Sequence, residues 1–171
     1  MLKHRRRLFA GAVAAAAAAA IAATGITAAS ATSRAGTAVS GTEHFQLMTT
    51  SATSSQSSLI ASGVFTAGGT STSTSSTTGT AKFANGTFVI THSKGTGTQT
   101  LNPKTCLLTV NLKGTYTLSN GTGAYSRISG SGIYQLSILA IGQKVSGKCS
   151  RALPPLTFQQ VIRASGPVSL P

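Results

Sequence analysis

The clearest pattern in the chain is an alternation of apolar and polar residues between positions 106 and 118. The even positions carry Cys, Leu, Val, Leu, Gly, Tyr and Leu, and the odd positions from 109 to 117 carry Thr, Asn or Lys. Side chains of a strand point alternately to its two faces, so this period of two predicts a long strand with one buried and one exposed face. Such strands are typical of antiparallel sheets.

Shorter segments predict further strands on both sides of this one. EHFQLM (43–48) and SSLIASGVFTAG (57–68) each favour one strand, and LTFQQVIRA (156–164) alternates again. The segment IYQLSILAIG (133–142) is apolar on both faces, which indicates a central or enclosed strand. The Ser/Thr-rich segment 70–80 is either a linker or an exposed strand, and we expect it to contribute nothing to the core.

Two Asn-Gly pairs predict hairpins. Asn85-Gly86 lies between two strand-like runs, and Asn120-Gly121 follows the long alternating strand. A tight turn at the second pair would set Tyr116 across from Tyr125. Seven or eight strands at this spacing predict an all-β fold, a single antiparallel barrel of about eight strands, with a β-sandwich as the alternative.

The first 31 residues have the pattern of a secretory signal peptide. Lys3 and three arginines (5–7) precede an Ala-rich apolar run, and Ala29-Ser30-Ala31 provides a cleavage site. A membrane anchor is the alternative, and the pattern leaves the general and twin-arginine export routes both open. We therefore expect a signal peptide over 1–31, a flexible linker over 32–41, a barrel domain over 42–171 and a secreted mature protein.

The two cysteines of the chain, Cys106 and Cys149, both fall in the predicted mature part. Thiols oxidise outside the cytoplasm, and two cysteines allow one pairing, so we expect a Cys106–Cys149 disulfide. Closing a loop of 149 − 106 = 43 residues would stabilise the fold by about 4 kcal/mol on the chain-entropy estimate. Two free buried thiols are the alternative.

Acidic residues are almost missing, which excludes several chemistries. Glu43 is the only Asp or Glu in 171 residues, so neither the paired carboxylates of a glycosidase nor a calcium or magnesium site can form. No serine lies in a Gly-x-Ser-x-Gly turn, and His44 and His92 are expected to be surface strand residues. The sequence therefore assigns no catalytic residue, metal or cofactor.

Basic residues give the chain a strong positive charge. Removal of the signal leaves 14 − 4 = 10 Lys and Arg against one acid, a net charge of +9. The densest set is Lys144, Lys148 and Arg151, a candidate anion patch for anionic cell-wall polymer. The aromatic residues lie mainly in core-like positions, so we do not expect a nucleic-acid partner. Charge kept for solubility is the alternative explanation.

A glycine-tyrosine phrase occurs twice between positions 121 and 134. The first copy is Gly121, Gly123 and Tyr125, and the second is Gly130, Gly132 and Tyr134. A dinucleotide-binding loop needs a third glycine and a following helix, and neither is present. Glycines two apart leave one face of a strand bare, so an aromatic ring of a neighbouring strand can lie there, and Tyr116 is the candidate.

The run GTYTLSNGTGAYSRISGSGIYQL (114–136) resembles the glycine-rich strand-turn-strand of secreted actinobacterial proteins related to allene oxide cyclase and dirigent barrels. The resemblance covers about 25 residues and implies an eight-stranded barrel whose apolar interior can enclose a small hydrophobic molecule. Those families isomerise a lipid epoxide or direct radical coupling, and dirigent proteins use acidic residues in the cavity. The resemblance assigns no functional residue here.

These features lead us to expect one of three functions. The first is a secreted, non-catalytic barrel that binds a small apolar ligand or none. The second is a cationic structural or adhesive protein of the cell envelope, and the third is an isomerase like allene oxide cyclase. The sequence does not define the oligomeric state.

Overall fold

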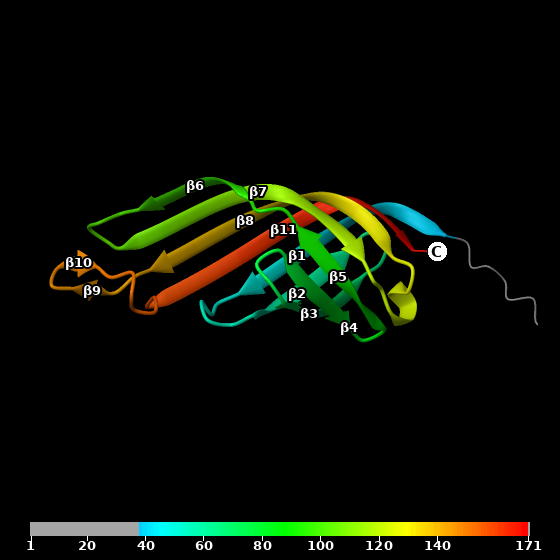
Figure 1. Cartoon of the computed structure of the whole chain (residues 1–171), viewed down its shortest axis with the longest axis horizontal. Coiled ribbons are helices and arrows are strands. Elements are labelled where there is room, and N and C mark those ends of the chain that lie inside the picture. The colour runs from blue at the N-terminus through cyan, green and yellow to red at the C-terminus, as the bar shows by residue number, and fades with distance from the viewer. Residues whose placement is uncertain (1–37, 171) are drawn as a thin grey trace, which may run out of the picture. The chain divides into compact units, whose positions relative to one another are not determined.

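The computed structural model describes residues 38–170, which form an antiparallel β-barrel with a sheet extension (Figure 1). The predicted signal peptide and residues 32–37 of the predicted linker lie outside the described residues. The strands are β1 (Val39–Thr49), β2 (Gln56–Ser62), β3 (Ala67–Ser73), β4 (Thr78–Phe83), β5 (Gly86–His92), β6 (Thr96–Leu101), β7 (Leu107–Ser119), β8 (Ser129–Ile141), β9 (Lys144–Val145), β10 (Lys148–Cys149) and β11 (Thr157–Leu170).

Eight of these strands close the barrel. Their order is β5-β4-β3-β2-β1-β11-β8-β7, and β5 pairs back onto β7 between Val89↔Ser119 and His92↔Tyr116. Closure leaves the sheet without free edges in this region, which is how a barrel avoids exposed strand edges. The predicted all-β barrel of about eight strands is confirmed, and the sandwich alternative is wrong.

The strands β7, β8 and β11 run on beyond the closed barrel as an open sheet. There β6 replaces β5 as the neighbour of β7, and Leu107 pairs with Ile141, which pairs with Thr157. The short hairpin β9–β10 follows β8 at this end (Figure 1). Strand β6 was not predicted from the sequence, because all six of its residues are exposed and show no apolar alternation.

The predicted hairpins are present, but their turns differ from the expectation. Phe83 pairs with Gly86, so the first turn consists of Ala84 and Asn85. In the second, Tyr116 pairs with Gly132, and the expected pairing with Tyr125 is wrong. Residues 120–128 instead form a longer loop with a 3₁₀ turn, η1 (Gly123–Tyr125), which packs over one end of the barrel.

Two predicted boundaries and one expectation about burial need correction. The expected strand over 57–68 breaks at Gly63, whose φ of 140° favours glycine, and so gives two strands, β2 and β3. The segment 70–80 is the β3–β4 hairpin, which confirms the strand interpretation. Its Ser71 is buried, so the expectation that the segment supplies no core was wrong. Strand β1 begins at Val39, before the expected start of the barrel at position 42.

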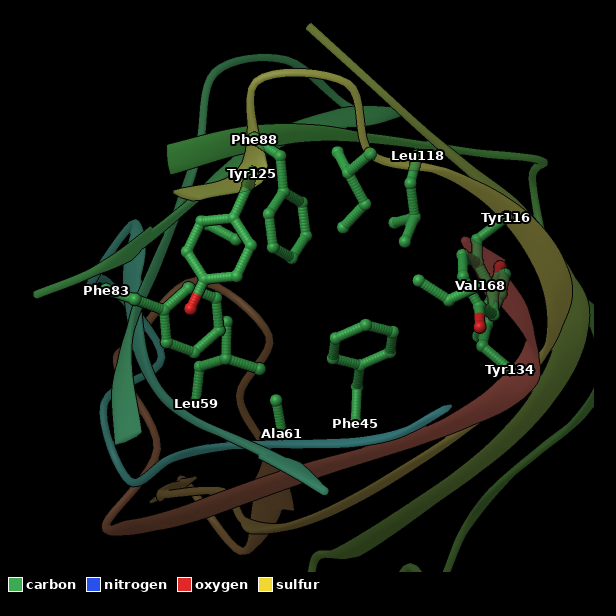
Figure 2. Close-up of a cluster of buried hydrophobic side chains, with 12 residues drawn as sticks. Phe45, Leu59, Ala61, Phe83, Phe88, Tyr116, Leu118, Tyr125, Tyr134 and Val168 are labelled. Carbon is green, nitrogen blue, oxygen red and sulfur yellow. The ribbon is translucent and has the colours of Figure 1, made fainter. Parts of the chain in front are cut away.

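One end of the barrel is filled by aromatic side chains that converge from several strands (Figure 2). Phe83 and Phe88 lie with ring centroids 5.6 Å apart, and Tyr125 from η1 lies 5.5 Å from each. Phe65, from the β2–β3 turn, lies 5.0 Å from Tyr125. These rings close this end of the barrel with a packed apolar core.

Two tyrosines of β7 and β8 each cover a glycine of the other strand. Tyr116 pairs with Gly132 and Gly114 pairs with Tyr134, and all four residues face the barrel interior. A methyl group on Gly132 would lie 2.8 Å from Tyr116 Cε1, and one on Gly114 would lie 2.5 Å from Tyr134 Cε1. Each ring can therefore pack at its position only because the opposite residue is a glycine without a side chain. By contrast, Gly121 and Gly123 lie in the loop and not on a strand.

Replacement of Gly132 by alanine should lower the free energy of unfolding by about 1–3 kcal/mol, the usual cost of an overpacked interior. The new methyl group would collide with the Tyr116 ring and the Ser165 carbonyl. Gly68→Ala in β3 is the matched control, because no atom lies within 4 Å of its new methyl group. Urea denaturation measures both variants, and equal midpoints would contradict the proposed role of the Tyr–Gly contacts.

Candidate ligand cavity and basic tip

A cavity of about 200 Å³ lies inside the barrel next to the aromatic core. The cavity wall is mainly apolar and includes Phe45, Ile90, Tyr116, Leu118, Leu136 and Ile162. Phe45 separates the cavity from the filled end, with its ring centroid 6.1 Å from both Phe88 and Tyr116. The exposed Ser73 is part of the cavity rim, so the cavity reaches the surface at the β3–β4 turn.

Apolar surface predominates in this cavity, but polar side chains also line it: Ser71, Ser73, Thr78, His92, Tyr116, Tyr134 and Gln160. Tyr134 donates its hydroxyl proton to the carbonyl of Ser93 at 2.9 Å, and His92 packs edge-on against the Tyr134 ring at 5.6 Å. The Tyr116 hydroxyl is different, because it is buried and has no hydrogen-bond partner within residues 38–170. Burial, with a smaller contribution from the negative charge of Glu43, raises the pKa of Tyr116 to about 12. The Tyr116 side chain therefore stays neutral and offers an unused hydrogen-bond donor.

Glu43, the only acid of the chain, lies fully buried in the barrel and does not line the cavity. The backbone N–H of Phe65 donates to Glu43 Oε2 at 3.0 Å, while Oε1 has no partner among the described residues. Burial raises the pKa of Glu43, and its contacts with backbone N–H groups offset this in part. Glu43 is two residues from Phe45 and so shares its inward face, but the alternation alone does not predict that a carboxyl group is buried there.

The disulfide Cys106–Cys149 is confirmed, with the two Cα atoms 5.4 Å apart. It joins the turn before β7 to the β9–β10 hairpin and so fixes both loops at the far end of the sheet extension. We call this end the tip, defined as residues 101–107 and 139–157. A disulfide is consistent with an extracellular location.

The candidate anion patch lies at this tip. Lys144 and Lys148 stand on β9 and β10, and Arg151 lies in the loop after them, all exposed. Lys144 Nζ donates to the carbonyl oxygen of Lys104 at 2.6 Å, which brings a fourth basic side chain to the set. Lys104 was not predicted to join the patch, because it is 40 residues away from Lys144, although the predicted disulfide to Cys106 could have indicated it.

A second cavity, of about 300 Å³, lies under the tip. Its wall includes the side chains of Leu101, Leu108, Ala140 and Phe158, and the loop that carries Arg151 and Leu153 covers it. Within residues 38–170 no group of three or more His, Cys, Asp or Glu side chains is placed to hold a metal ion. The described part of the chain also contains no helix long and apolar enough to cross a membrane.

Comparisons with known proteins give no relative for this chain. No protein-family model matches it, and neither a curated protein nor a solved structure does so. The resemblance of residues 114–136 to the allene oxide cyclase and dirigent barrels therefore stays a prediction. The cavity, the buried glutamate and the tip have to be interpreted from their own geometry.

Glu43 should make the protein more stable in acid than at pH 8. An acid whose pKa is raised by folding binds its proton more tightly in the folded state, so stability is greatest below the unfolded pKa of about 4.5. Stability is then lost as the pH rises through the folded pKa, by about 1.4 kcal/mol per pKa unit. Glu43→Gln, which resembles the protonated form, should lose less stability between pH 4 and pH 8.

Urea denaturation of both proteins at the two pH values measures this difference. No other Asp or Glu side chain is present to titrate in this range. Equal losses of stability in the wild type and in Glu43→Gln would show that folding leaves the pKa of Glu43 unchanged.

Proposed function

We propose that this protein binds a small, mainly apolar molecule inside the barrel and does not transform it. The observation that carries the proposal is the apolar cavity of about 200 Å³ with one buried, unpartnered hydroxyl group among the described residues, that of Tyr116. Apolar cavities with few polar groups are the usual form of small-molecule sites in proteins.

The cavity volume limits the size of the ligand. A cavity of about 150 Å³ is sufficient to bind benzene in an apolar protein interior. The barrel cavity is somewhat larger, at about 200 Å³. It therefore suits a molecule of one ring or a short branched chain, and part of a longer molecule could leave through the rim at Ser73.

The Tyr116 hydroxyl adds a requirement for the chemistry of the ligand. A buried donor without a partner costs free energy, and a ligand that accepts its hydrogen bond recovers that cost. We therefore infer a ligand with one acceptor, such as a carbonyl or ether oxygen, in an otherwise apolar frame. The hydroxyl is buried in this structure, so the Tyr116 side chain has to shift for its donor to meet that acceptor. An isomerase would need a group for acid-base chemistry at the ligand. Glu43 does not line this cavity, and His92, which does, holds Nδ1 3.0 Å from the Ser93 carbonyl oxygen.

We also propose that the chain is exported and that the barrel works outside the cytoplasm. The signal pattern of residues 1–31 and the Cys106–Cys149 disulfide support this location. The mass of the secreted protein should equal that of residues 32–171 less two hydrogen atoms. A mass that retains residues 1–31 would contradict cleavage.

Toluene and benzonitrile are suitable probes of the cavity, because they are similar in size and only benzonitrile carries a strong acceptor. Both should bind, with chemical-shift changes at cavity residues in NMR titrations. Tyr116→Phe should weaken benzonitrile binding by about twofold to tenfold, the worth of one hydrogen bond, and leave toluene binding unchanged. Ala164→Leu, which places a larger side chain in the cavity wall, should weaken both.

Tyr125→Phe is the matched control, because Tyr125 lies in the aromatic core and not in the cavity wall. It should bind both probes like the wild type. Binding that Ala164→Leu does not weaken, or no shifts at cavity residues with either probe, would contradict a ligand site in the barrel.

A further inference from the structure

We propose that the tip binds to the surface of an anionic lipid bilayer. The tip combines exposed apolar side chains with four basic ones, which is the composition of protein surfaces that bind at the lipid–water interface. This inference does not depend on the proposed ligand of the barrel, because the tip and the barrel cavity share no residues.

Exposed apolar side chains are concentrated at the tip. Of the 11 large apolar residues that are exposed within residues 38–170, seven lie there. Leu156 is 67% exposed and Val145 52% exposed, so water covers much of both side chains. The remaining five are Leu101, Leu107, Leu139, Ile141 and Leu153. Apolar surface of this kind at one place marks an interaction site.

Strand pairing and cross-links place these residues at one end of the sheet, although Leu101, which pairs with Leu108, lies on the face opposite to Leu107 and Ile141. Leu107 pairs with Ile141, and the Cys106–Cys149 disulfide joins the loops that flank them. Gln143 Nε2 also donates to the carbonyl of Pro154 at 2.9 Å, which holds the loop of Leu153 against the end of β8. Figure 1 shows the β6–β7 turn, the β9–β10 hairpin and the start of β11 at the same end of the sheet.

The positive charge of the tip indicates which kind of partner binds there. Lys104, Lys144, Lys148 and Arg151 are all exposed, and the only acid of the chain, Glu43, is buried in the barrel. Each basic side chain near an anionic leaflet strengthens binding by roughly fivefold. A second copy of the chain would bring the same four positive charges and be repelled. A negatively charged partner that also accepts apolar side chains is therefore required.

An anionic bilayer fits both requirements better than a wall polymer does. Lipid head groups supply the negative charge, and the acyl boundary below them takes up leucine and valine side chains. A soluble polyanion pairs with the basic side chains alone and leaves the apolar side chains in water. The contribution of the apolar side chains therefore separates the two partners.

The test is cosedimentation of the mature, disulfide-bonded protein with lipid vesicles. Vesicles of phosphatidylglycerol and phosphatidylcholine (1:1) should bind it, and vesicles of phosphatidylcholine alone should not. The triple variant Lys144→Gln/Lys148→Gln/Arg151→Gln should bind the anionic vesicles at least tenfold more weakly. The double variant Val145→Ser/Leu156→Ser should also bind at least tenfold more weakly, because two apolar side chains no longer enter the lipid.

Matched controls remove equal charge and equal apolar surface elsewhere. Lys82→Gln/Lys113→Gln/Arg163→Gln changes three exposed basic residues outside the tip, and Ile60→Ser/Ile133→Ser changes two residues that are 56% and 59% exposed. Both controls should stay within about threefold of the wild type in vesicle binding, because the substituted side chains do not reach the head groups.

Three results would overturn the proposal. The first is equal binding to vesicles with and without phosphatidylglycerol. The second is loss of binding in the triple variant with full binding in Val145→Ser/Leu156→Ser, which would identify a polyanion such as poly(glycerol phosphate) as the partner. The third is an equal loss in the tip variants and in their controls, which would indicate nonspecific adsorption.

Discussion

The structure depends on two contacts between β7 and β8, in each of which a tyrosine ring of one strand packs over a glycine of the other. Tyr116 lies over Gly132 and Tyr134 over Gly114, so two large rings occupy the barrel wall at positions where the opposite strand has no side chain. The Tyr134 hydroxyl also holds the Ser93 carbonyl, in the crossover where β5 gives way to β6 beside β7. This contact therefore lies at the point where the closed barrel becomes an open sheet.

The same arrangement leaves room for the cavity. One end of the barrel is filled by the rings of Phe65, Phe83, Phe88 and Tyr125, and within the described residues no comparable set of rings fills the interior between Phe45 and Ile162. Protein interiors are normally packed to the density of organic crystals. A space of about 200 Å³ inside a mainly apolar barrel is therefore unusual. Tyr116 is part of the wall of this space, and its buried hydroxyl has no hydrogen-bond partner within residues 38–170.

Much of the fold could be predicted from the alternation of apolar and polar residues, and the disulfide from the count of cysteines. The alternation in β7 is visible because one of its faces is buried or half-buried along most of its length. The exposed β6 carries no such signal. The register of β7 and β8 was predicted wrongly, because Asn120-Gly121 resembles a tight turn while Tyr125 and Ile128 draw a longer loop into the barrel end.

The cavity and the tip could not be predicted in the same way. Both depend on residues that closure of the barrel and the disulfide bring together from distant parts of the chain, such as Phe45 with Tyr116 and Lys104 with Lys144. A local pattern gives no information on such pairs. The burial of Glu43 likewise could not be predicted. The sequence shows only that Glu43 belongs to a strand, and closure of the barrel buries its carboxyl group.

The most direct measurement of the central claim is a crystal structure of the mature protein under xenon pressure. Xenon occupies apolar cavities of this size that are free of ordered water. The account predicts a xenon atom between Phe45, Tyr116 and Ile162, within contact distance of all three side chains. A cavity filled with ordered water that xenon does not displace, or side chains collapsed into the space, would contradict a site for an apolar ligand.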